Sequence, residues 1–126
     1  VAADFDLACK WFRLSAEHGN KDAQFFLGMI YLVGEGIPKD YEKAAYWFLQ
    51  AALQGHAKAQ TNLGSLYEHG FGLDRDYNRA YFWTLLAAAK GDALAEKNAQ
   101  TIADLLSPQE RAAIKGEASK WMSEHP

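Results

Sequence analysis

The repeating unit of this chain is clearest in residues 57–92, which read AKAQTNLGSLYEHGFGLDRDYNRAYFWTLLAAAKGD. Sliding the chain along itself by 36 residues, without a gap, places residues 21–56 over this stretch. Agreement at so many positions and at one spacing identifies an internal repeat. The identical pairs are Ala23 and Ala59, Gln24 and Gln60, Leu27 and Leu63, Gly28 and Gly64, Tyr31 and Tyr67, Gly34 and Gly70, Gly36 and Gly72, and Asp40 and Asp76.

Each copy holds two helical patterns and no strand pattern. In residues 41–54 the apolar side chains fall at i, i+3, i+4, i+7 and i+8, which is one face of an α-helix, and residues 57–69 repeat this spacing. The apolar–polar alternation that marks a strand never persists. We therefore predict an all-α chain with helices over residues 4–18, 21–33, 41–54, 57–69, 77–90, 93–106 and 108–123.

Two glycines inside predicted helices indicate close helix packing. Gly28 and Gly64 lie one period apart, although glycine in a helix interior costs about 1 kcal/mol relative to alanine. The simplest cause is steric, because a neighbouring helix that comes very close leaves no room for a side chain. We expect Trp11, Trp47 and Trp83 to fill the gaps between these close crossings.

The residues between the helices are typical helix ends. Asn20, His56 and Asp92 precede equivalent helices, where a side chain that accepts a hydrogen bond can cap free backbone N–H groups. Asp76 is placed to cap the helix after it, and Gly55 follows a helix as a C′ residue. Because His56 also lies beside a helix C-terminus, a cationic imidazole is a second expectation for it.

The last copy departs from the pattern where Ser107 replaces the glycine turn. Ser107 and Glu110 have the spacing of a capping box, and Pro108 occupies the first helical position. Terminal repeats that close an array are expected to be atypical. In this final helix we expect Ala112, Lys115, Ala118 and Met122 to fall near one side.

The repeated residues follow the pattern A-x-x-x-L-G-x-x-Y-x-x-G-x-G-(apolar)-x-x-D-x-x-x-A-x-x-W-x-x-x-A-A-x-x-G. This pattern resembles the Sel-1-like repeat family, a relative of the tetratricopeptide repeat, from Phe5 to about Ile102. The resemblance implies a right-handed α-solenoid of 36-residue helix-turn-helix repeats, closed here by a C-terminal capping helix. It also implies a function in binding other proteins or peptides, as in the members of this family, which are mostly bacterial. A secreted branch with a disulfide in each repeat is excluded, because Cys9 is the only cysteine.

The repeats also suggest how the chain is organised. At 126 residues it has the size of one domain. Within it we expect the second helix of a truncated repeat at 4–20, repeats at 21–56 and 57–92, and capping helices at 93–126. Because the chain opens on the second helix of a repeat, we expect a piece of a longer array whose open end associates with itself.

Composition excludes several classes of function. With 13 basic and 16 acidic residues the net charge is −3, whereas nucleic-acid binding needs a basic face. No apolar run approaches the roughly 18 residues of a membrane span, so membrane insertion is not expected. A single cysteine excludes an internal disulfide and a cysteine-built zinc site, and it leaves a cytoplasmic or a periplasmic location open.

Catalytic and cofactor motifs are missing as well. The four histidines form no H-x-x-x-H or H-E-x-x-H pair for a metal, and Cys9 falls on a helical flank as a small apolar residue. The sequence Gly70-Phe71-Gly72 has neither the preceding strand nor the lysine of a phosphate loop. No nucleophile with an adjacent base appears. We therefore expect no enzyme, no metal and no cofactor.

Candidate binding residues come from the family resemblance. In the tetratricopeptide relatives the first helix of each pair lines a concave wall that holds the ligand. Carried over, this wall comprises Phe25, Met29, Leu32 and Val33, then Thr61, Ser65, Glu68 and His69, and finally Lys97, Thr101, Asp104 and Leu105.

Two interpretations of the apolar quartet at 25–33 remain open. Contiguous exposed apolar residues often mark a binding site. The same residues are core if a helix from upstream packs on them. The favoured function is a non-catalytic module that binds a peptide or partner protein in its groove. The alternative is an envelope protein that contacts a glycan or a cell-wall enzyme.

Overall fold

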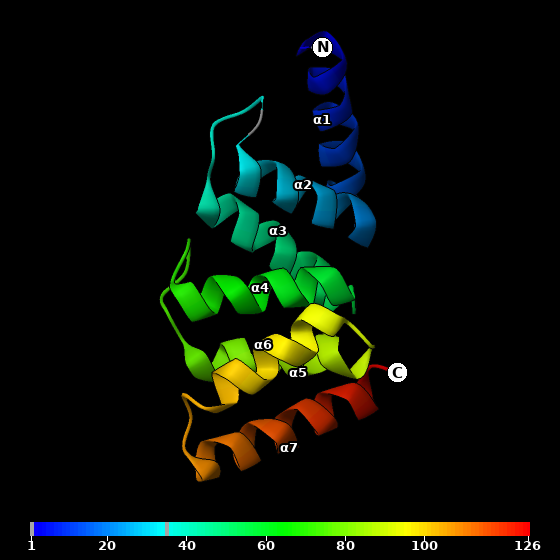
Figure 1. Cartoon of the computed structure of the whole chain (residues 1–126). Coiled ribbons are helices and arrows are strands. Elements are labelled where there is room, and N and C mark those ends of the chain that lie inside the picture. Colours follow the sequence, from blue (N-terminus) through cyan, green and yellow to red (C-terminus); the bar gives the residue numbers. More distant parts are fainter. Residues whose placement is uncertain (1, 35) are drawn as a thin grey trace.

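The computed structural model describes residues 2–34 and 36–126, and this part of the chain folds into helices and loops without a strand. The helices stack in chain order from the N-terminus to the C-terminus (Figure 1). The expected all-α solenoid of helical repeats is confirmed. The helices are α1 (Ala2–Glu17), α2 (Lys21–Val33), α3 (Tyr41–Leu53), α4 (Ala57–His69), α5 (Tyr77–Ala89), α6 (Ala93–Ala103) and α7 (Pro108–Glu124).

The helix bounds agree closely with the prediction, with one exception at α6. This helix ends at Ala103 rather than at residue 106. The backbone N–H groups of Leu105 and Leu106 bond back three residues, to Ile102 and Ala103, at 2.9 and 3.1 Å. The chain therefore tightens into a final turn before Ser107 begins the next helix.

Two close helix crossings explain the buried glycines. A Cβ atom on Gly28 would lie 2.7 Å from the ring of Phe48, which belongs to α3. A Cβ atom on Gly64 would lie 3.2 Å from the carbonyl oxygen of Ala80 and would also collide with Thr84, both on α5. The steric explanation of these glycines is confirmed, and it sets the tight contact of α2 with α3 and of α4 with α5.

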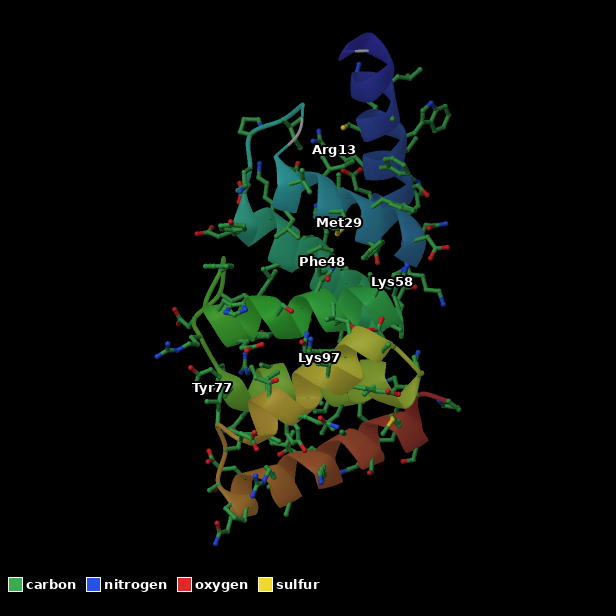
Figure 2. The ribbon with its side chains drawn as sticks, in the orientation of Figure 1. Arg13, Met29, Phe48, Lys58, Tyr77 and Lys97 are labelled. Atoms are coloured by element: carbon green, nitrogen blue, oxygen red, sulfur yellow. The ribbon has the colours of Figure 1, made fainter. Side chains whose placement is uncertain are left out.

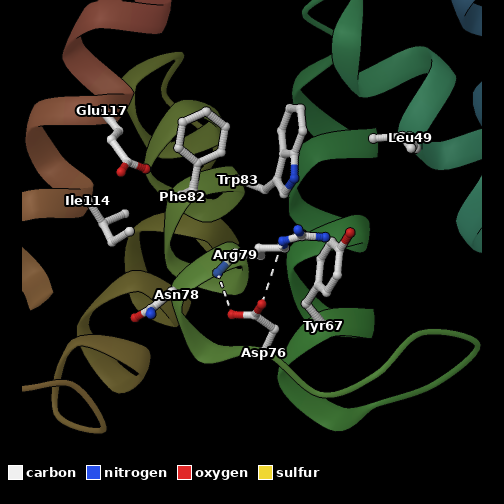
Figure 3. A pocket seen from close by; sticks show the side chains of 9 residues that line it. All are labelled: Leu49, Tyr67, Asp76, Asn78, Arg79, Phe82, Trp83, Ile114 and Glu117. Atoms are coloured by element: carbon white, nitrogen blue, oxygen red, sulfur yellow. Dashed lines mark hydrogen bonds and ion pairs between the residues drawn. The ribbon is translucent and has the colours of Figure 1, made fainter.

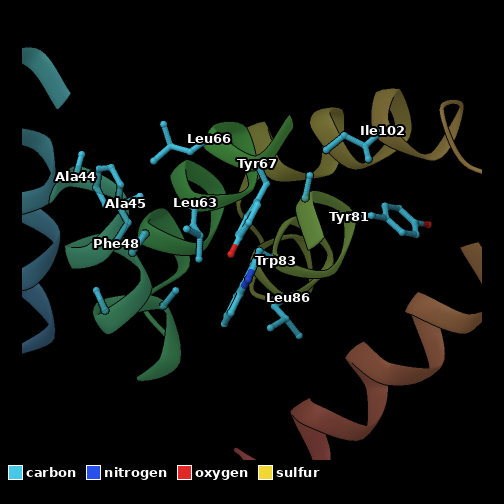
Figure 4. Packing of buried hydrophobic residues seen from close by; sticks show 14 of the residues in the cluster. Ala44, Ala45, Phe48, Leu63, Leu66, Tyr67, Tyr81, Trp83, Leu86 and Ile102 are labelled. Carbon is cyan, nitrogen blue, oxygen red and sulfur yellow. The ribbon is translucent and has the colours of Figure 1, made fainter. Parts of the chain in front are cut away.

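The core is built on leucine, phenylalanine and alanine more than on the three periodic tryptophans. Trp83 is buried, at 7% exposure, but Trp47 is only half-buried and Trp11 is 64% exposed. The expectation that all three fill the core is therefore wrong for Trp11, because α1 packs mainly against α2 and leaves this side uncovered. Figure 4 shows the central cluster, in which Phe48 and Leu63 are fully buried.

The expected helix caps are confirmed. The side chains of Asn20, Asp76 and Asp92 each accept a hydrogen bond from the backbone N–H three residues on, at 2.9–3.0 Å. The turns into the second helix of each pair use a left-handed glycine, with φ of 74° at Gly34 and 72° at Gly70. The caps fix where each helix begins, and hence which side chains face a neighbouring repeat.

Polar contacts join neighbouring repeats at a repeated position. Gln24 donates to the Ala16 carbonyl at 3.1 Å, and its own side-chain oxygen accepts a hydrogen bond from Gln54 at 2.9 Å. In the next repeat the buried Gln60 donates to the Ala52 carbonyl. Lys90, which stands where Gln54 did, bonds to the Gly55 carbonyl as Gln54 does to that of Gly19, but no bond from Lys90 to Gln60 matches the one between Gln54 and Gln24. The buried Oε1 atom of Gln60 has no hydrogen-bond partner among the described residues.

The C-terminal helix closes the array as expected. The Ser107–Glu110 capping box is confirmed, and its hydrogen bonds to Ser107 lower the pKa of the Glu110 carboxyl. The helix packs on α5 through Ile114 and Ala118, with Trp121 in edge contact with Trp83 at 6.1 Å between ring centroids. Of the four residues expected near one side, Ala118 is buried and Met122 half-buried, while Ala112 and Lys115 are exposed.

The first helix exposes apolar side chains. Leu7 and Leu14 are about half exposed, as is Phe26 on the adjoining α2. Phe26 packs against aromatic neighbours, with its ring 5.5 Å from that of Phe12. None of the described helices is long and apolar enough to cross a membrane.

Candidate binding groove

Two adjoining cavities lie along the N-terminal ends of α2, α4 and α6. They have volumes of about 470 and 630 Å³ and share Phe25 and Lys58, so they form one groove, here named the α2–α4–α6 groove. Figure 2 labels Met29, Lys58 and Lys97 on the face that these three helices form. The groove is lined by Lys21, Asp22, Phe25, Phe26, Met29, Gly55, His56, Ala57, Lys58, Thr61, Asn62, Asp92, Ala93 and Leu94.

The floor of the groove is apolar and well supported. The half-buried Phe25 ring stacks on His56, the residue before α4, at 4.6 Å and 19°, and lies 5.9 Å from the ring of Phe48. Asn62 donates a hydrogen bond to the sulfur of Met29 at 3.3 Å. Phe25 and Met29 thus contact α3 and α4, which follow them in the chain, and the exposed part of each side chain faces the groove.

His56 holds the wall of the groove as a neutral ring. Its Nδ1 atom accepts a hydrogen bond from the Ala59 N–H at 3.1 Å, which makes it the N-cap of α4. Its Nε2 atom lies 3.4 Å from the carboxylate of Asp22. Burial lowers the pKa of His56 below its usual value, despite the opposing effect of Asp22. The expectation of a cationic His56 at a helix C-terminus is therefore wrong; its role as an N-cap is confirmed.

The acidic and basic side chains of the groove differ in their partners. Asp92 accepts a hydrogen bond from the Ala95 N–H at 2.9 Å, and Asp22 faces His56. Lys21 and Lys58 are both exposed. Within residues 7–34 and 36–126, neither lysine takes part in a salt bridge.

The structure brings together three of the sequence-predicted residues. Phe25, Met29 and Thr61 line the groove. Thr61 is buried, however, and its hydroxyl donates to the Ala57 carbonyl at 3.1 Å, so it contributes its methyl group more than a polar atom.

The other predicted residues lie nearer the C-terminal ends of their helices and line none of the cavities described. Leu32, Ser65 and Glu68 are half-buried, whereas Val33 and His69 are exposed, and the His69 ring lies 5.6 Å from that of Phe71. On α6 and the turn after it, Lys97, Thr101, Asp104 and Leu105 are all exposed.

Sequence reasoning missed the residues of the first helical turns. Asp22, Lys58 and Leu94 occupy one position in successive repeats, and each lines the groove. They differ from copy to copy, as a variable surface on a repeated frame does, and this variation could have found them. Asn62 was also missed, since its spacing assigns it to the apolar face of its helix.

A further cavity, of about 550 Å³, lies on the opposite side between α3, α4, α5 and α7 (Figure 3). Arg79 stands over the Tyr67 ring at 5.9 Å and pairs with Asp76 at 3.5 Å, and hydrogen bonding to Tyr67 raises the pKa of Arg79. These groups serve the cap of α5, so the polar atoms here are engaged within the fold. No group of three potential metal ligands occurs in the described part of the chain.

The repeats match a known family model. The model of the Sel1 repeat matches residues 1–20, 21–56 and 57–92. The chain belongs to the Sel1 repeat family. Proteins with this repeat are typically protein-interaction modules and generally non-catalytic scaffolds.

Two solved bacterial structures show the same fold. The chain is 32% identical to c5321, a protective antigen of uropathogenic Escherichia coli with an SLR fold, at a TM-score of 0.87 over 93% of this chain. It is 39% identical to a Sel1 repeat protein from Oxalobacter formigenes, at a TM-score of 0.73 over 74% of this chain. The chain spans only 25% and 27% of those two proteins. A comparison with curated proteins gave no match.

Proposed function

We propose that this Sel1 repeat domain is a non-catalytic interaction module that binds a peptide segment of a partner protein in the α2–α4–α6 groove. The observation that carries this proposal is the joining of two cavities over an apolar floor made by Phe25 and Met29. A buried apolar centre with a polar rim is the usual arrangement of a binding interface. Volumes of about 470 and 630 Å³ have room for several side chains of a peptide.

The groove suits a peptide better than a glycan. Glycan sites generally offer an aromatic ring as a stacking platform to the sugar, yet none of the residues that line this groove is a tryptophan or a tyrosine. The rings of Phe25 and His56 stack on each other instead. Asn62 brings an amide, a group that can hydrogen-bond to the backbone of an extended chain. These features support a protein partner over the envelope-glycan alternative.

The chemistry of the groove supports binding without catalysis. The Nδ1 atom of His56, the obvious base, already caps α4. The carboxylate of Asp92 is likewise engaged at the start of α6. We therefore propose a module that needs no cofactor or metal, and the net charge of −3 argues against nucleic acid as the partner.

A matched pair of leucines on α6 and its following turn tests this function. Leu94 lines the groove and is 57% exposed, while Leu105 lies outside it and is 51% exposed. A phage library of random 12-residue peptides is panned on the protein, and enriched peptides are titrated against Leu94→Asp and Leu105→Asp. We expect Leu94→Asp to weaken binding at least tenfold and Leu105→Asp to have little effect. Equal binding to both variants, or no enriched peptide at all, would contradict the proposed function.

A further inference from the structure

We propose that the peptide recognised by this groove is acidic and apolar: one apolar side chain enters between Phe25, Met29 and Leu94, and neighbouring carboxylates pair with Lys21 and Lys58. This inference rests on the proposed function and deepens it by naming the chemistry of the partner. Three lines of observation support it: the shape of the apolar part, the pairing of the charges, and their distribution along the helices.

The apolar part of the groove is a pocket between three repeats. Phe25 and Met29 supply one wall from α2, and Leu94 supplies the other from α6, with 57% of its surface exposed. Thr61 and Asn62 of α4 lie between them. A single branched apolar side chain that enters here covers exposed surface from three helices at once, and the removal of such surface from water favours association.

The basic side chains at the groove have no internal partner, whereas the acidic ones do. Asp92 caps α6 and Asp22 faces His56 at 3.4 Å, so both carboxylates are engaged. Lys21 and Lys58 are exposed and form no salt bridge within the described residues. A carboxylate on the partner would therefore gain an ion pair without breaking one in this protein.

The acidic Glu68 of α4 lies outside this end of the groove. Lys58 and the acidic Glu68 lie ten residues apart on α4, which is about 15 Å along the helix axis. This distance exceeds the Debye length of about 8–10 Å at physiological salt, so Glu68 hardly weakens the field around Lys58. The N-terminal ends of α2, α4 and α6 add the positive pole of each helix dipole at the same place.

The composition of the panned peptides gives the first test. Peptides that depend on Leu94 should be enriched in Asp and Glu beside Leu, Ile, Val or Met, relative to the unselected library. Groove-dependent peptides that are neutral or basic would overturn the inference while leaving the proposed function intact. Peptides that bind without need of Leu94 would contradict the proposed function itself.

Charge reversal in the full chain gives the second test. The variants are Lys58→Glu and Lys21→Glu, with Lys115→Glu on the exposed face of α7 as the control. We expect each groove variant to lower the affinity for an acidic panned peptide by about fivefold to tenfold, because an ion pair at the rim becomes a repulsive pair. The control should change this affinity less than twofold. A synthetic version of the peptide, with Lys in place of its acidic residues, should bind the Lys58→Glu variant more tightly than it binds the parent protein.

The readout separates recognition from folding. All three lysines are exposed, so the circular dichroism melts of the variants should overlay that of the parent. Equal losses with Lys58→Glu and Lys115→Glu would show a general effect of net charge and would overturn the inference. A lysine-substituted peptide that shows no preference for Lys58→Glu would overturn it as well.

Discussion

At the scale of single residues, the repeat is specified by positions where only one size of side chain fits. Gly64 meets the backbone of α5 in the tight crossing of α4 with α5, while Gly116 on the exposed face of α7 has nothing within 4 Å of an added Cβ. Both glycines are helical. The same substitution should therefore have opposite effects at the two sites.

We predict that Gly64→Ala destabilises the fold by about 1–3 kcal/mol, because the added methyl group forces α4 and α5 apart. Gly116→Ala should instead stabilise it by up to about 1 kcal/mol through helix propensity alone. Urea denaturation followed by circular dichroism measures both. A neutral Gly64→Ala would mean that the two helices do not pack as closely as the structure shows.

His56 adds a dependence on pH at the same scale. Because burial lowers the pKa of His56 in the folded protein, the unfolded chain takes up its proton first as the pH falls below about 6.5. The stability that neutral His56 provides is present above that pH and is lost as the pH falls through its folded pKa. His56→Asn copies the cap that Asn20 provides one repeat earlier and removes this titration.

The measurement is the difference in urea midpoint between pH 7.5 and pH 5.0 for the parent and for His56→Asn. We expect the parent to lose more stability than the variant over this range. The other histidines are common to both proteins, so their titration cancels in the comparison. Equal losses in the two proteins would show that His56 is not held neutral by the fold.

At the scale of helices, the sequence predicted the elements well and their environments less well. The repeated alanines and glycines and the caps at Asn20 and Ser107 correspond to local backbone requirements, and these were confirmed in place. The exposure of Trp11 could not be predicted from its periodicity. The equivalent Trp83 is buried and Trp11 is exposed, because burial depends on which helices pack against each side chain.

The groove was only partly predictable for a related reason. Phe25 and Met29 were found from their helical position, but Lys58 and Leu94 lie on first turns that come together only when three repeats are stacked. The rotation between repeats decides which positions meet, and no single helix pattern encodes it. The predicted residues of α2 and α4 that lie outside the groove, such as Glu68, are nearer the C-terminal ends of these helices, whereas the groove lies at the N-terminal ends.

The tryptophans give the test at this scale. We predict that Trp83→Ala costs about 3–5 kcal/mol, as for a fully packed aromatic side chain, and Trp11→Ala less than about 0.5 kcal/mol. The half-buried Trp47 should fall between them. Denaturation of the three variants under one condition ranks them. A large loss with Trp11→Ala would place that side chain in a packed interior.

At the scale of the whole molecule, two exposed surfaces differ in character. The α2–α4–α6 groove combines an apolar floor with charged lining residues such as Asp22 and Lys58, while the outer side of α1 exposes Leu7, Trp11 and Leu14. The groove is suited to reversible recognition of a peptide. The bare side of α1 is suited to contact with a second apolar surface, since repeat arrays need polar ends to stay soluble.

We therefore predict that this chain self-associates through α1 at high concentration. Sedimentation velocity between about 10 and 500 μM should show a rising average mass. The double variant Trp11→Glu, Leu14→Glu should remain monomeric, whereas Leu53→Glu, which alters an equally exposed leucine on α3, should associate like the parent. A monomeric parent throughout this range would rule the contact out.

The central claim, that a peptide binds in the α2–α4–α6 groove, is tested most directly by chemical-shift mapping. A panned peptide is titrated into the ¹⁵N-labelled protein and the amide resonances are followed. The account predicts that the largest shifts cluster at Phe25, Met29, Asn62 and Leu94, with little change along α7. Shifts centred on α1, or on the opposite cavity around Arg79, would contradict it.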